Sequence, residues 1–141
     1  YFHLTAESFL WSAGCYRFPA PALERWAEFT QDPQKGNRLL RIKAAYEKKG
    51  LSFSEPDRKR LPAGADPKSP RALFLLHRGF YTWSDPAAGL PKEILSPQAA
   101  PYLAGLFAGG RSLFEWLADL FQGLPGPGPD PGKIKDAAPW D

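Results

Sequence analysis

The first eighteen residues carry the hydrophobic period of a β-sheet. Apolar and polar residues alternate over residues 2–6, and an aromatic-rich extended run over residues 9–16 follows the polar pair Glu7 and Ser8. This pattern predicts an N-terminal antiparallel β-hairpin. Because an isolated hairpin is only marginally stable in water, its strands need further partners.

Helical periodicity replaces this pattern beyond residue 21. Apolar positions predict a first helix over residues 23–30, which the sequence Gln31-Asp32-Pro33 ends. Asn37 is a suitable N-cap for a second helix, and Gly50 stands just past its end. Two consecutive helices are therefore expected after the hairpin.

Short elements and helix breakers alternate between residues 51 and 83. A short extended piece is expected at residues 51–53, and a proline-rich loop follows to residue 68. Ser69-Pro70 supplies an N-cap and a proline at the first helical position for a short helix that runs through His77. Residues 80–83 have the composition of a last strand.

The remaining part of the chain is predicted to be helical up to residue 122. Ser96-Pro97 repeats the helix-start pattern, and Gly109-Gly110 should break or kink that helix. Ser112 and Glu115 have the spacing of a capping box for a final helix, which Gly123 closes. Residues 123–141 are rich in Pro and Gly and are expected to be an extended tail.

These elements predict one α+β domain over residues 1–122, in which the N-terminal antiparallel β-hairpin plus a later strand pack against four to five helices. The 141 residues are 43% hydrophobic and include five Trp, ten Phe and five Tyr, which is enough aromatic material for a core. No apolar run is long enough to span a membrane, so we expect a soluble, cytoplasmic protein without a membrane partner. The chain has no Met and begins at Tyr1, from which we expect an N-terminal part to be missing.

The residues that usually perform catalysis are scarce. His3 and His77 are the two histidines, and Cys15 is the single cysteine, so an internal disulfide is excluded and a catalytic triad would have few candidate members. Their spacing suggests no metal site, and neither a dinucleotide-binding nor a phosphate-binding glycine motif is present, so no cofactor is expected. The carboxylates are scattered, among them Glu7, Glu24, Glu28, Asp66 and Asp85.

Charge is concentrated in residues 35–60, where nine basic side chains stand against three acidic ones. Such a segment can contact phosphates by electrostatics alone, which leaves weak nucleic-acid binding open. The basic residues are divided between a helix and a proline-broken loop, and the net charge of the chain is only +3. We therefore favour a solvated surface and expect no nucleic-acid binding at physiological salt.

Several segments together resemble a bacterial family known as domain of unknown function 2461. They are Tyr1-Phe2-His3-Leu4, Gly14 with Tyr16-Arg17-Phe18-Pro19, the segment from Arg58 to Asp66 followed by Pro70, the segment from Leu75 to Tyr81, Ser96-Pro97 and the last helix. The resemblance covers residues 1 to about 120 and corresponds to the C-terminal portion of the family pattern. It implies the fold but no activity, and a polar Arg/Asp/Lys block of the family belongs to an N-terminal half that this chain lacks.

Three functions remain open at this point. The leading hypothesis is a non-enzymatic binding or interaction module for an unknown protein or a small anionic ligand. The first alternative is an enzyme that acts on a small anionic substrate through carboxylates and a basic loop, and the second is nucleic-acid binding through residues 35–60. For a ligand site, the candidate residues are Arg58, Lys59, Arg60 and Asp66.

Overall fold

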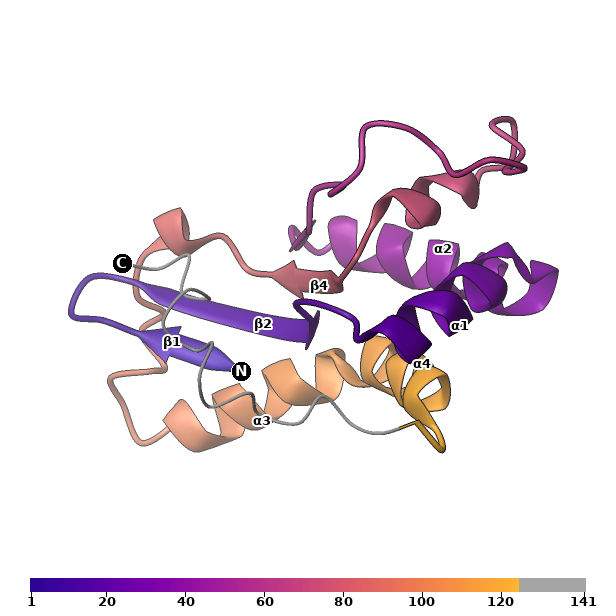
Figure 1. Ribbon diagram of the computed structural model, residues 1–141. Helices are drawn as coiled ribbons and strands as arrows, with labels where there is room; N and C mark the ends of the chain where they lie inside the picture. The colour runs from indigo at the N-terminus through magenta and orange to yellow at the C-terminus, as the bar shows by residue number, and fades with distance from the viewer. Residues whose placement is uncertain (125–141) are drawn as a thin grey trace, which may run out of the picture.

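The computed structural model describes residues 1–124 and has the predicted α+β architecture (Figure 1). A four-stranded antiparallel sheet has the strand order β1-β2-β4-β3. The strands are β1 (Phe2–Leu4), β2 (Phe9–Cys15), β3 (Ser52–Phe53) and β4 (Phe80–Trp83). The N-terminal hairpin and the later strand are thus confirmed, and the short extended piece completes the sheet.

The register of β2 differs on its two sides. β1 pairs with the first half of β2, so that Phe2 stands opposite Trp11 and Leu4 opposite Phe9. β4 pairs with the second half, from Ser12 opposite Trp83 to Cys15 opposite Phe80. β2 is therefore the central strand that joins the hairpin to the rest of the sheet.

Two helices follow the hairpin, α1 (Ala20–Gln31) and α2 (Pro33–Glu47). The prediction that Asn37 caps the second helix is wrong, because α2 begins four residues earlier at Pro33. Asp32 is the N-cap, and its carboxylate accepts hydrogen bonds from the backbone N–H groups of Gln34 and Lys35 at 3.0 and 2.8 Å. One Asp-Pro pair therefore both ends α1 and starts α2.

The short helix predicted after Ser69-Pro70 is a 3₁₀ helix, η1 (Ala72–Leu76), and a second 3₁₀ helix, η2 (Pro86–Ala88), follows β4. The C-terminal helices are α3 (Ala99–Gly109) and α4 (Arg111–Phe121), which confirms the break at the glycine pair. The predicted capping box at Ser112 is wrong. The N-cap of α4 is Gly110, which has no side chain that could accept a hydrogen bond. The Tyr46 hydroxyl, from α2, instead accepts a hydrogen bond from the Leu113 N–H at 3.3 Å.

An aromatic cluster centred on Trp26 forms the core between the sheet and helices α1, α2 and α4. The Trp26 ring lies 4.8 to 5.9 Å, between ring centroids, from four other aromatic rings, those of Phe18, Phe74, Phe80 and Trp116. α3 lies apart from this core, beneath the β1–β2 hairpin in Figure 1. The predicted tail falls, from residue 125 onward, outside the described residues.

Candidate functional site

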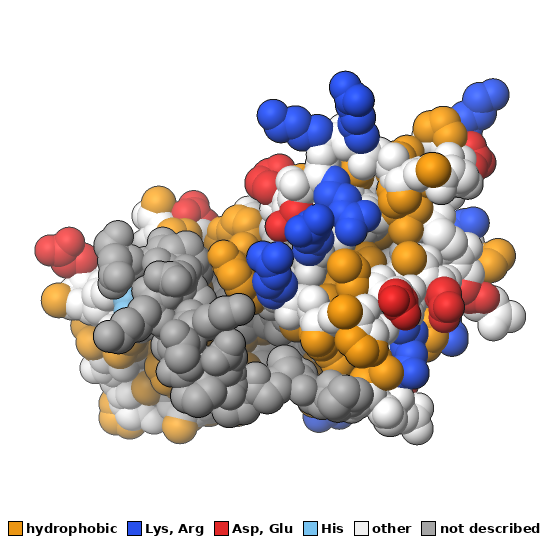
Figure 2. Space-filling model, viewed as in Figure 1, with side chains coloured by type: hydrophobic (Ala, Val, Ile, Leu, Met, Phe, Trp, Pro, Cys, Tyr) orange, Lys and Arg blue, Asp and Glu red, His pale blue; other side chains and the backbone are white. Residues whose placement is uncertain are grey.

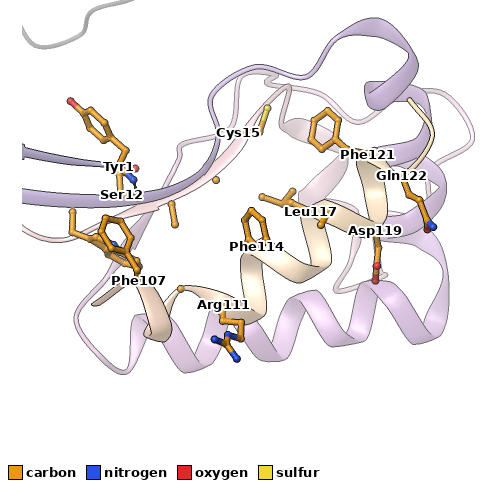
Figure 3. Close-up of a pocket in the computed structure, with 15 residues that line it drawn as sticks. Tyr1, Ser12, Cys15, Phe107, Arg111, Phe114, Leu117, Asp119, Phe121 and Gln122 are labelled. Atoms are coloured by element: carbon orange, nitrogen blue, oxygen red, sulfur yellow. Dashed lines mark hydrogen bonds between the residues drawn. The ribbon is translucent and has the colours of Figure 1, made fainter. Parts of the chain in front are cut away.

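A groove of about 990 Å³ lies between β2 and the helices α3 and α4 and is here called the β2 groove (Figure 3). Residues 12–15 of β2 form one wall, and α4 forms most of the other. Tyr1, at the start of β1, closes one end, while Phe121 lies near Cys15 at the other. A volume of this size is typical of ligand sites in proteins.

The strand wall of the β2 groove ends in unpaired backbone. The last contact between β1 and β2 joins Tyr1 and Ser12, which exchange hydrogen bonds of 2.9 and 3.1 Å. β2 then continues to Cys15, with β4 on its other side only. Because hydrogen-bonding pairs alternate along an antiparallel strand, the N–H and C=O of Gly14 face the groove side, where no described strand meets them.

The helical wall of the β2 groove is apolar and exposed. Phe114 has 70% of its surface exposed although it lies in the middle of α4, and Phe107 has 44%. In Figure 3, Phe114 and Leu117 project from α4 toward the strand, whereas Arg111 and Asp119 point away from it. The groove therefore offers a surface for apolar side chains next to a backbone edge.

Cys15 lines the β2 groove without the features of a nucleophile. Burial raises the pKa of its thiol. A hydrogen bond to the backbone carbonyl of Arg17 lowers the pKa, but by less than burial raises it. The thiol is the donor of that bond, with the sulfur and oxygen 3.3 Å apart. A thiol in this state is a weak nucleophile.

The predicted ligand residues do not gather at one site. Arg58 lines a second hollow of about 350 Å³ against α1, here called the α1 chamber, whereas Lys59 and Arg60 are exposed and do not line it. The carboxylate of Asp66 accepts a hydrogen bond from the Lys68 N–H at 2.9 Å, so it stabilises a turn.

His77 was missed as a site residue by the sequence reasoning, and it lies in the wall of the α1 chamber. Only 5% of its surface is exposed, and its Nδ1 atom is buried without a hydrogen-bond partner among the described residues. Burial lowers its pKa, and Lys43 lowers it further, while Asp57 and Glu55 oppose the shift in part. At neutral pH the imidazole is therefore uncharged.

This burial predicts a pH-dependent stability. In the unfolded chain the imidazole of His77 takes up a proton near pH 6.5, whereas in the folded chain it does so only at a lower pH. At pH values between these two, the unfolded state therefore binds more protons than the folded state. The free energy of unfolding should fall by up to about 1.4 kcal/mol per pH unit below pH 6.5 because of His77. Urea unfolding at pH 7.5 and 5.5 measures this difference. His77→Gln should reduce the difference in the free energy of unfolding between the two pH values. His3→Gln, which removes an exposed imidazole, is the matched control. If His77→Gln leaves the difference unchanged, His77 is not its source.

The basic segment over residues 35–60 is divided among several local contacts. Lys35 lies over the ring of Phe29, with its ammonium 3.5 Å from the ring centroid, and Arg38 approaches Glu115 and Asp119 at 3.7 and 3.8 Å. Figure 2 shows Lys and Arg side chains on the α2 side of the molecule, with Asp and Glu side chains among them.

Two further findings concern the described residues alone. In residues 1–124, no group of three or more His, Cys, Asp or Glu side chains is arranged to hold a metal ion. No helix in the same range has both the length and the hydropathy that crossing a membrane requires.

The comparisons with known proteins agree with the resemblance found in the sequence. A family described as conserved hypothetical protein (DUF2461) matches residues 1–116 of the chain. No curated protein matches, and no solved structure matches either. The matched residues include the whole sheet and most of the residues that line the β2 groove, but not Leu117, Ala118, Asp119, Phe121 and Gln122.

Proposed function

The chain belongs to the DUF2461 family of conserved hypothetical proteins, and from its groove we propose that it is a non-enzymatic binding module for an extended polypeptide segment. One observation carries the proposal: the exposed side chains of Phe107 and Phe114 line an apolar groove beside β2, where no described strand meets the backbone of Gly14. A bound segment would pair with Gly14 as an added strand, antiparallel to β2, on the groove side. Strand addition of this kind gives affinity through main-chain hydrogen bonds.

The register of the hairpin specifies which side chains of the bound segment enter the groove. Phe2, opposite Trp11, faces α3, because its ring lies 6.4 Å from that of Phe107. Side chains alternate between the two faces of a strand, so the residues of the bound segment that stand opposite Ala13 and Cys15 also face the helices. The segment should therefore carry apolar side chains at positions i and i+2. The residue between them exchanges both hydrogen bonds with Gly14.

The exposed aromatic surface supplies the second source of affinity. Phe114 and Phe107 are large apolar side chains left in contact with water, and a bound segment would cover part of each. The charged side chains Arg111 and Asp119 point away from the strand and leave this surface apolar (Figure 3). The proposal therefore needs no charge on the segment and no chemistry from Cys15.

A short designed peptide tests the proposal on the full chain. The probe is acetyl-Val-Thr-Val-amide, whose two valines occupy the positions opposite Cys15 and Ala13 and whose end stops short of Tyr1, the partner of Ser12. Titration followed by amide NMR should give saturable shifts, and exchange of the Gly14 amide proton with solvent should slow. The matched control is the same peptide N-methylated on its central threonine, which removes the donor to Gly14 and should prevent binding.

A pair of surface variants locates the site. Phe114→Lys removes an apolar side chain from the groove, and should weaken peptide binding by about 1 to 2 kcal/mol, or roughly 5- to 30-fold. Leu95→Lys is the control, because Leu95 is 74% exposed and does not line the groove. Equal binding of the N-methylated peptide, or equal loss in both variants, would refute the proposal.

Two other occupants are distinguishable outcomes of the same experiment. Sedimentation that detects a dimer, abolished by Phe114→Lys, would identify a second copy of the chain as the occupant and overturn the peptide proposal. If the Gly14 amide proton is already protected from exchange in the free monomer, another segment of the same chain occupies the β2 groove. This result would also overturn the peptide proposal.

A further inference from the structure

We propose that the α1 chamber binds a small zwitterion with a short aliphatic part, of the kind that an aliphatic amino acid presents. The chamber is separate from the β2 groove, and the two share no lining residue. Its ligand would therefore be bound independently of any peptide. This inference goes beyond the proposed function and does not rest on it.

The walls of the α1 chamber select a ligand with an apolar body. α1 contributes Leu23 and Trp26 with two alanines, and Pro62 and Leu75 close the other sides. Three polar side chains, Glu24, Arg58 and His77, join this apolar lining. Its volume of about 350 Å³ accommodates a molecule with a few carbon atoms beyond its charged groups.

The chain segments that carry Arg58 and His77 are hydrogen-bonded to each other. The N–H of Arg58 donates to the Leu76 carbonyl at 2.9 Å, and the carboxylate of Asp57 accepts from the Arg78 N–H at 2.6 Å. These two bonds hold the loop segment at Arg58 against the segment that carries His77. A buried imidazole with an unpartnered nitrogen costs free energy, and such groups are typical of sites that act on a ligand.

The charges around the chamber favour a ligand that carries both signs. Arg58 and Glu24 form no ion pair with any described residue, so each is free to meet a ligand. An anion alone would meet the repulsion of Glu24, and a cation alone that of Arg58. A carboxylate on Arg58, an ammonium group on Glu24 and an aliphatic part against Leu23 match the two charged groups and the apolar walls of the chamber.

Three probes of matched size separate the parts of this proposal. L-leucine carries both charges, 4-methylpentanoate carries only the carboxylate, and 3-methylbutylamine carries only the amine. Calorimetric titration of the full chain at neutral pH should give saturable leucine binding. Each singly charged analogue should bind roughly tenfold more weakly or worse, because one charged hydrogen-bonding partner is lost.

Charge-neutralising variants assign the two partners. Arg58→Gln should weaken leucine binding roughly tenfold or more without weakening the amine, and Glu24→Gln should do so without weakening the carboxylate. Arg60→Gln is the control, because Arg60 is exposed and does not line the chamber. The inference is overturned if leucine shows no saturable binding at millimolar concentration. It is also overturned if an analogue binds as tightly as leucine, or if Arg60→Gln has the effect expected of Arg58→Gln.

Discussion

Trp26→Ala is expected to destabilise the domain by about 3 to 5 kcal/mol, the range for removing a large buried aromatic side chain. Trp26 is only 1% exposed and lies at the centre of the aromatic cluster. Its Nε1 donates a hydrogen bond of 2.8 Å to the Phe74 carbonyl. After the substitution, this buried carbonyl has lost its hydrogen-bond donor, which adds to the cost. Because a domain has a total stability of roughly 5 to 15 kcal/mol, this single change removes a large part of it.

Urea unfolding followed by circular dichroism measures this loss. Trp83→Ala is the matched control, because Trp83 is only half-buried and, among residues 1–124, only the ring of Tyr81 lies near it, 5.5 Å away. Trp26→Phe should cost less than Trp26→Ala, since it keeps most of the ring packing and loses the hydrogen bond. If Trp83→Ala destabilises as much as Trp26→Ala, Trp26 is not the centre of the core.

Local sequence signals predicted those parts of the fold that depend on neighbouring residues. The strand over residues 80–83 was predicted with its observed bounds, because it combines aromatic residues with clear breakers on both sides. The start of α2 was missed because Asp32-Pro33 ends one helix and begins the next, and proline serves both purposes. A rule for one helix end does not detect two ends that share a residue.

Contacts between distant residues account for the other errors. Ser112 has the spacing of an N-cap, but its hydroxyl lies 3.0 Å from the Tyr46 hydroxyl, which takes part in holding the start of α4. No local pattern contains that partner, which stands in α2. The capping rule therefore gave a reasonable but wrong start for the last helix.

The candidate sites were less predictable than the fold, because each depends on what other segments leave uncovered. Periodicity places Phe114 on the apolar side of α4, yet it is exposed because no described strand covers that part of the groove. His77 could be recognised only as a histidine in a short helix. Its burial depends on α1 and on the segment at Arg58, both far away in the sequence. Arg58 alone of the four predicted ligand residues reaches the α1 chamber.

The same substitution in two helices should have opposite effects on stability. Gly36 lies in the first turns of α2, where a Cβ atom would stand 2.1 Å from the Thr30 carbonyl oxygen and 2.5 Å from the Cδ atom of Arg71. Gly105 lies in α3, where a Cβ atom would meet nothing within 4 Å. Both residues are helical, so an alanine gains about the same helix propensity at each, roughly 1 kcal/mol.

Steric contact decides the sign at Gly36. The Thr30 carbonyl belongs to the last turn of α1, and the short connection at Asp32 holds the two helices close together. Gly36→Ala therefore has to push α1 and α2 apart, and overpacking of this kind costs about 1 to 3 kcal/mol or more. Since Thr30 is fully buried and its hydroxyl donates to the Trp26 carbonyl at 2.8 Å, the displacement would also disturb the aromatic core.

We expect Gly36→Ala to lower the free energy of unfolding by about 2 kcal/mol, and Gly105→Ala to raise it by about 0.5 to 1 kcal/mol. Urea unfolding of both variants beside the wild type measures the two changes under identical conditions. A stabilising Gly36→Ala would mean that α1 and α2 are farther apart than the structure places them. A destabilising Gly105→Ala would mean that α3 is covered at this position. The opposite signs thus test the α1–α2 contact and the exposure of α3 separately.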